Sequence, residues 1–173
     1  MNLQVSVWPW LKLNGILKVT EAVFAQSGGM LVDDFSEGAT FNEFEISFRM
    51  FMGRGTSRPA DGLSVSIGNN LPNLAKPAEE GVPDAAFRVC FDAWDSGGGE
   101  APAIEIFNGK QSVAIQKFHG KSSASNDAKF VKDDGEFLMM WDNKKWADVN
   151  IRVINGLANV NFRGYDVIKN VPI

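Results

Sequence analysis

The feature that most constrains the fold of this chain is an alternation of apolar and polar side chains. It runs through the segments 44–50, 63–67, 87–92, 149–153 and 158–163. Successive side chains of a β-strand point to opposite faces, so each segment is predicted to be a strand with one buried face. A sheet with one apolar face must bury that face against another layer. The alternation therefore predicts an all-β fold, either a sandwich of two antiparallel sheets or a barrel.

Asparagine–glycine pairs mark the expected turns between such segments. Asn108-Gly109 and Asn155-Gly156 each lie between two alternating runs. A type I′ hairpin turn needs positive φ at both central residues, which Asn and Gly tolerate. Helical periodicity is almost absent, and 127–141 is the best candidate for a helical turn. The sequence therefore predicts hairpins at both Asn-Gly pairs and almost no helix.

The composition fits one globular domain, 1–173, with a substantial core. Of its 173 residues 45% are hydrophobic and 22% are charged, and the formal net charge is −4. There is no basic patch of the kind that nucleic acid requires, so no nucleic-acid partner is expected. No window approaches the roughly 18 apolar residues that span a membrane, so no membrane insertion is expected. The single cysteine, Cys90, excludes an internal disulfide, and the N-terminus has no signal-peptide pattern.

The stretch 90–106, CFDAWDSGGGEAPAIEI, holds the main candidate site. It carries Asp92, Asp95, Glu100 and Glu105 around three consecutive glycines. Glycines let the backbone adopt otherwise strained conformations and let other groups come close. Calcium takes about six to eight oxygen ligands in flexible geometry, although the spacing here is not that of an EF-hand. The residues alone leave three interpretations open: a solvated acidic turn, a pair of catalytic acids, or a calcium site.

Catalysis is the least favoured of these interpretations. Glycoside hydrolysis needs two carboxylates about 5–10 Å apart across the scissile bond. Asp92 and Asp95 are three positions apart and cannot both face the same way on a regular strand. His119 has no cysteine or acidic residue at ligand spacing, and Cys90 alternates with apolar neighbours as a structural thiol. The chain is therefore expected not to be an enzyme and to have no catalytic residues.

The order of motifs along the chain resembles a known family. ILKVTEAVFAQSGGMLV, FEISFRMFM, ADGLSVSIG and FRVCFDAWDSGGGEAPAIEI follow one another. Together they resemble the legume-type (L-type) lectins of the concanavalin A-like lectin/glucanase superfamily, and especially its bacterial domains with an FDxxDxGGGEAPAI-like segment. The resemblance runs from about Leu11 to Ile173, and it implies a jelly-roll sandwich of a flat back sheet and a curved front sheet. Family members continue with a further strand, so either the C-terminal end is truncated and lacks this final strand, or the N-terminal extension 1–10 supplies it as an edge strand.

The resemblance also implies a calcium site in the stretch 90–106. The matching positions are Asp92, the main-chain carbonyl of Trp94, Ser96, and Glu100 ahead of a proline. The family usually has asparagine where this chain has Ser96. Either the serine hydroxyl binds the ion less well than the amide, or Asp95 takes over as the ligand.

A carbohydrate site beside the calcium is the next implication of the resemblance. The aspartate of the ADG motif, here Asp61 followed by Gly62, accepts hydrogen bonds from sugar hydroxyls. The aromatic residue beside the calcium loop, here Trp94, stacks on a sugar face. The asparagine replaced by Ser96 donates to the sugar in the family. The resemblance therefore predicts Asp61, Gly62, Trp94 and Ser96 as the carbohydrate-binding residues.

The second, transition-metal site of legume lectins is expected to be absent, because its Glu and His positions match Cys90 and Ala103. The E-[IL]-D-x-x-E pattern of related glucanases does not occur. The resemblance thus implies a calcium-dependent carbohydrate-binding domain, extracellular or at the cell surface, whose partner is a glycan or polysaccharide. The alternative, which Ser96 favours, is a non-catalytic structural or adhesion module of a larger extracellular protein or assembly. A homo-oligomer or neighbouring domains of a larger protein are further expected partners.

Overall fold

The structure of the chain is a computed structural model. It describes residues 12–13, 16–20, 26–32, 38–53, 61–69, 71, 80–83, 85–118, 130–141 and 144–173. Within these residues there are strands and no helix, so the predicted all-β class is confirmed. The extension 1–10 lies outside the described residues. No helix of the described part is long and apolar enough to cross a membrane.

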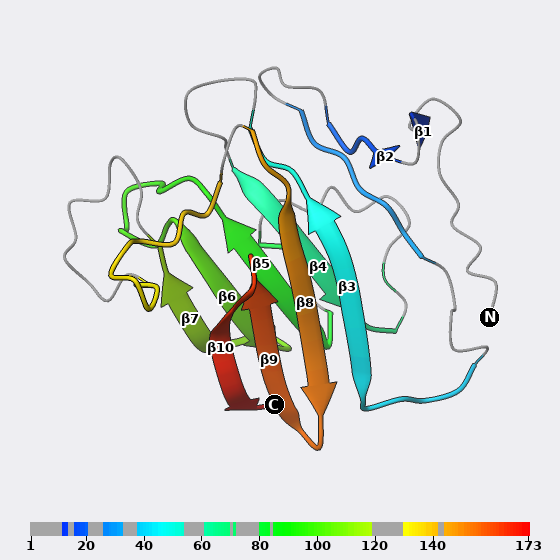
Figure 1. Ribbon diagram of the computed structural model, residues 1–173. Coiled ribbons are helices and arrows are strands. Elements are labelled where there is room, and N and C mark those ends of the chain that lie inside the picture. The colour runs from blue at the N-terminus through cyan, green and yellow to red at the C-terminus, as the bar shows by residue number, and fades with distance from the viewer. Residues whose placement is uncertain are drawn as a thin grey trace.

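The described strands form two main sheets. They are β1 Lys12–Leu13, β2 Ile16–Leu17, β3 Phe44–Met50, β4 Gly62–Ile67, β5 Phe87–Asp92, β6 Ala103–Asn108, β7 Gln111–Lys117, β8 Ala147–Ile154, β9 Leu157–Phe162 and β10 Tyr165–Pro172. The longer strands make two antiparallel four-stranded sheets, in the orders β10-β9-β8-β3 and β4-β5-β6-β7 (Figure 1), while β1 pairs with β2. Each alternating segment of the sequence lies in one of the two main sheets, so the predicted strands are confirmed.

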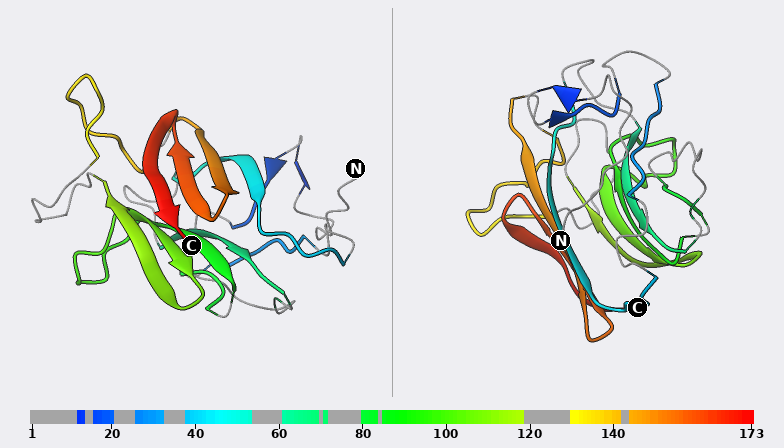
Figure 2. Two further views of the ribbon diagram at one scale, coloured as in Figure 1. Left: turned by 90° about the horizontal axis from the view of Figure 1, so that it is seen from below. Right: turned by 90° about the vertical axis from the view of Figure 1, so that its right-hand side faces the viewer.

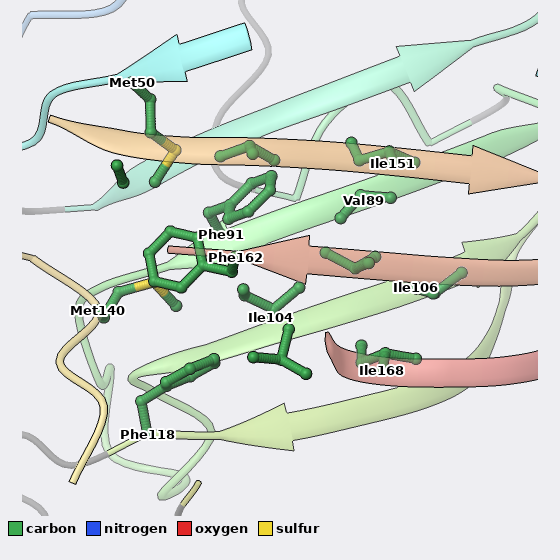
Figure 3. Close-up of a cluster of buried hydrophobic side chains, with 14 of the residues drawn as sticks. Met50, Val89, Phe91, Ile104, Ile106, Phe118, Met140, Ile151, Phe162 and Ile168 are labelled. Carbon is green, nitrogen blue, oxygen red and sulfur yellow. The ribbon is translucent and has the colours of Figure 1, made fainter. Parts of the chain in front are cut away.

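The two sheets face each other as the layers of a sandwich (Figure 2). In β8 the burial alternates: Val149, Ile151 and Val153 are buried in the core, and their neighbours point outward. Side chains of both sheets meet in the core shown in Figure 3, where the rings of Phe91 and Phe162 lie 6.2 Å apart between centroids. Burial of apolar surface stabilises a fold by roughly 25 cal/mol per Å². The inward-facing apolar side chains of the alternating strands therefore hold the two layers together.

Two hairpins have positive φ at both turn residues, as a type I′ turn requires. Asn155 and Gly156, with φ of 52° and 69°, join β8 to β9, so this predicted hairpin is confirmed. Arg163 and Gly164, with φ of 54° and 87°, join β9 to β10. The alternation extends the predicted strand through Arg163. This boundary is wrong, because the strand ends at Phe162 and the chain reverses there.

At the other Asn-Gly pair the turn is shifted by one residue. Asn108 ends β6 and pairs with Gln111, which leaves Gly109 and Lys110 as the turn residues. Of these only Gly109 has a positive φ, 58°, which suits a type II′ turn with glycine at its first central position. The predicted type I′ turn at Asn108-Gly109 is therefore wrong. The pairing of β6 with β7 shifts register just before the turn, so strand pairing sets the position of this turn.

The helical turn considered for 127–141 is wrong within the described residues, because 130–141 contains no helix. Val131 and Phe137 form an isolated antiparallel bridge instead. Gly135, between them, has a φ of 83°. A residue in this left-handed region interrupts helical geometry and lets the chain reverse.

Strand β5 is buried on both faces, which its alternating sequence does not indicate. Arg88 and Cys90, on the face that points away from the core, are only 5% and 3% exposed. A segment before β5 lies over this face, where the N–H of Val82 donates to Ser66 Oγ of β4 at 3.0 Å. The outer face of the β4–β7 sheet is therefore partly covered.

Candidate functional site

The candidate site lies where β4 begins and β5 ends. Gly62 of β4 pairs with Asp92 of β5, and the N–H of Ala93 donates to the carbonyl oxygen of Asp61 at 2.8 Å. Antiparallel pairing thus places Asp61 and Gly62 beside the first residues of the segment 92–100, named here the acidic loop. Two predicted groups of site residues that are far apart in sequence are brought together.

The two aspartates of the acidic loop accept hydrogen bonds from the loop's own backbone. Asp92 Oδ1 accepts the N–H of Trp94 at 3.0 Å. Asp95 Oδ1 accepts the N–H groups of Gly97 and Gly99 at 2.8 and 3.0 Å. These two glycines have φ of 119° and 73°, a region that glycine adopts without steric cost. Aspartate side chains commonly fix turns in this way, so the acidic loop has a defined shape.

Glu100 closes the acidic loop and has one oxygen without a partner. Its Oε1 accepts the N–H of Ser96 at 2.6 Å. Its Oε2 is buried and has no hydrogen-bond partner among the described residues. A Cβ at Gly98 would lie 2.7 Å from that oxygen, so a side chain there would displace the Glu100 carboxylate from its present position. A buried carboxylate oxygen without a partner is costly, and a cation beside it would remove that cost.

Trp94 is the outward-facing side chain of the acidic loop. It is 41% exposed, and Asp61 and Ser96 are exposed as well. Ala93 and Ala101, near the two ends of the loop, are buried. The loop is therefore anchored at both ends in the sandwich and exposes one aromatic ring and the Ser96 side chain to solvent.

The fourth carboxylate of the stretch 90–106 does not belong to the acidic loop. Glu105 lies within β6, opposite Cys90, and accepts a hydrogen bond from Ser112 Oγ. In the part of the chain that the structure describes, no three acidic, histidine or cysteine side chains form a group that could hold a metal ion. The predicted calcium ligands are a different kind of set, because they combine carboxylates with a main-chain carbonyl and a hydroxyl.

Cys90 and Ala103, which the sequence resemblance was expected to place at the transition-metal positions of legume lectins, are both buried in neighbouring strands. Burial raises the pKa of the Cys90 thiol from 9.0 to about 12. The thiol therefore stays protonated at neutral pH, whereas the thiolate is the form that reacts and binds metals. His119 lies outside the described residues.

Arg88 is a buried charge that sequence reasoning missed. Its Nη1 donates to the carbonyl oxygen of Glu80 at 2.7 Å, and its Nη2 donates to that of Gly109 at 3.2 Å. Its guanidinium carbon lies 4.2 Å from the ring centroid of Phe107. In the alternating pattern Arg88 counts as an outward polar residue. No local signal marks it as buried, because the groups that cover it come from other parts of the chain.

Comparisons with known proteins return no relative. No family model matches the chain, no curated protein matches it, and no solved structure matches it. The observations that bear on function are therefore the chain's own residues and the contact that brings the acidic loop to the start of β4.

Proposed function

We propose that this domain binds carbohydrate with the help of a calcium ion held by the acidic loop. The observation that carries the proposal is the contact between two distant segments, in which the Ala93 N–H bonds the Asp61 carbonyl oxygen. It joins the backbone of Asp61 to the residue that precedes Trp94, and the side chains of Asp61 and Trp94 are both exposed. Ligand sites combine apolar surface with a few convergent polar groups that fix orientation, and a sugar ring needs both.

Calcium suits the acidic loop because the available donors are hard oxygens. The groups that would hold the ion are Asp92, Glu100, the main-chain carbonyl of Trp94, and Ser96 or Asp95. The buried Oε2 of Glu100 supports this choice, since a cation beside it would supply the partner that the described residues lack. When bound, the ion neutralises the carboxylates and holds the loop in one conformation.

The sugar would pack against Trp94, whose rigid indole ring offers a large apolar surface. Asp61 would accept hydrogen bonds from hydroxyl groups, and Ser96 would add a hydroxyl contact. Single sites of this kind bind weakly, because polar desolvation offsets much of the gain. Several copies on one surface would supply avidity. A domain with this function would meet its glycan or polysaccharide outside the cell or at the cell surface.

Thermal unfolding in EDTA, in calcium and in magnesium tests the ion. Calcium at about 100 times its Kd stabilises a folded protein by about 2.7 kcal/mol, which corresponds to roughly 5–10 °C in Tm for a chain of this size. Glu100→Gln should lose most of this shift. The matched control Glu136→Gln changes an exposed glutamate outside the acidic loop and should keep the shift. If calcium shifts the Tm of both variants equally, any bound calcium does not depend on Glu100.

A glycan array with and without a chelator tests the sugar. Binding should disappear with the chelator, and Trp94→Ala should lose glycan binding while it keeps the thermal response to calcium. If the domain binds no glycan on the array but keeps its thermal response to calcium, the result would instead support a structural or adhesion module. Hydrolysis of any glycan on the array would contradict a purely binding function.

A further inference from the structure

We propose that the outer face of the sheet β10-β9-β8-β3 is a second binding surface, for a neutral polysaccharide chain, which acts without calcium. Its centre is named here the amide face. The amide face consists of Ser47 in β3, Asn150 in β8, and Asn159 and Asn161 in β9. These side chains alternate along their strands with more buried ones, so they point away from the core. The β4–β7 sheet lies on the opposite side of their sheet (Figure 2). The surface is separate from the acidic loop, which belongs to the other sheet.

Asparagine is an unfavourable residue at these positions if only the fold is considered. Asn is depleted in strands, where β-branched residues pack better. Asn150 and Asn161 nevertheless stand directly opposite each other in β8 and β9, the two inner strands of their sheet. Asn159 lies on the same face, opposite Arg152. Residues that break a local preference without a packing gain are expected at functional positions.

The amide groups are held in place by their neighbours. Asn150 Nδ2 donates to Glu45 Oε1 at 2.6 Å and to Ser47 Oγ at 2.8 Å. Asn161 Nδ2 donates to Asp166 Oδ1 at 2.8 Å. Within the described residues neither side-chain oxygen of this Asn pair accepts a hydrogen bond. These oxygens can therefore accept from a ligand rich in hydroxyl donors, and side chains that are already fixed lose little freedom on binding.

The surroundings of the amide face favour a neutral ligand. A hollow of about 340 Å³ lies over the sheet, and Arg49 and Asp148 line it together with Ser47, Asn150 and Asn161. Arg49 Nε and Asp148 Oδ1 form an ion pair at 2.9 Å, so their charges offset each other. The guanidinium of Arg49 lies 5.9 Å from the ring centroid of an exposed tryptophan, residue 146, which adds an aromatic group at one end.

A protein partner fits this surface less well. The buried centre of a protein interface is apolar and often aromatic, whereas the centre of this face is polar, and the apolar outward residues Ile154 and Leu157 stand at the hairpin end of β8 and β9. A polyanion is disfavoured because Arg152, on the same face, stands opposite Glu45, and Arg49, which lines the hollow, already forms an ion pair with Asp148. A polysaccharide chain offers many hydroxyl groups and no charge, which matches fixed amide oxygens in a shallow hollow.

Affinity electrophoresis in gels with soluble neutral polysaccharides (β-glucan, mannan, xylan) and EDTA tests the proposal. We expect at least one of them to retard the wild type, and the double variant N150T/N161T to lose at least tenfold in affinity. Threonine favours strands, so the variant should keep or raise its urea midpoint. Trp94→Ala should be retarded like the wild type, because it alters only the acidic loop.

Each other outcome overturns the proposal. Migration of the wild type unaffected by every neutral polysaccharide would show that the surface is an ordinary solvated sheet face. Retardation by polyuronates alone would contradict a neutral ligand. Equal retardation of N150T/N161T and wild type would remove the amide face from the interaction. A dimer that ultracentrifugation detects in the wild type and not in N150T/N161T would identify a contact between copies instead. Because EDTA is present throughout, these results are independent of the calcium-dependent site.

Discussion

Replacing Arg88 with methionine should destabilise the domain substantially, although methionine fits the length of the site. The arginine joins two segments to β5, through the carbonyl oxygens of Glu80 and Gly109, and it also covers Phe107. Methionine fills similar volume and removes the donors and the charge. The prediction therefore isolates the polar role of a side chain that is 5% exposed.

The magnitude follows from three contributions. Two hydrogen bonds from a charged donor contribute about 1.5–3 kcal/mol each, and the contact with the ring of Phe107 contributes about 1–2 kcal/mol. Methionine also recovers part of this loss. It removes the desolvation cost of a buried charge, which is several kcal/mol, and it removes the buried Arg88 Nε, which has no hydrogen-bond partner among the described residues. If the recovered desolvation offsets about half of the loss, the net destabilisation is about 2–4 kcal/mol.

Urea unfolding followed by tryptophan fluorescence measures this change. With an m-value of roughly 2 kcal/mol/M, the midpoint of Arg88→Met should fall by about 1–2 M. The urea midpoint of Arg88→Lys should fall by at least as much. The lysine ammonium group is a point charge and cannot donate to two separate carbonyl groups as the planar guanidinium group does. Arg152→Met, an exposed arginine of β8, should change stability by no more than about 0.5 kcal/mol. A midpoint for Arg88→Met equal to that of this control, or full rescue by lysine, would refute the reasoning.

Three other perturbations test the core, the thiol and the acidic loop. Phe91→Ala removes a fully buried ring that packs against Phe162; chemical denaturation should show a loss of about 3–5 kcal/mol, and a loss below 1 kcal/mol would contradict the core assignment. Because the pKa of the Cys90 thiol is raised from 9.0 to about 12, the unfolded state ionises first as pH rises. The difference in unfolding free energy between the wild type and Cys90→Ala should be constant below pH 9. Above pH 9 the wild type should lose about 1.4 kcal/mol per pH unit relative to the variant, up to the folded pKa. If this difference does not change with pH, the thiol is not buried in its protonated form. Gly98→Ala would place a Cβ 2.7 Å from Glu100 Oε2, so the flexible Glu100 carboxylate would have to move. Calcium titration should therefore show at least tenfold weaker binding with little change in Tm in EDTA, and an unchanged calcium affinity would show that this oxygen does not bind the ion.

The sequence was enough to predict which residues form the candidate site, but not how the two segments that carry them come together. The acidic loop is one continuous segment, so its carboxylates and glycines were visible in the sequence, and two of the glycines, Gly97 and Gly99, stand where the backbone has a positive φ. The contact between Ala93 and Asp61 was not visible from spacing, because it depends on the register of β4 against β5. The proposed amide face was equally hidden, since Asn150 and Asn161 are partners only through the pairing of β8 with β9.

The sequence by itself determined the strands and the faces that they bury. Alternation sets which side chains share a face, and one hairpin, at Asn155-Gly156, follows from residues that tolerate positive φ. Only the tertiary structure decided that β5 is covered on both sides and that Arg88 lies inside. It also decided that the β6–β7 turn begins at Gly109. The reason is physical: periodicity is a local property of one strand, whereas covering a second face or fixing a register depends on contacts from segments far away in the chain.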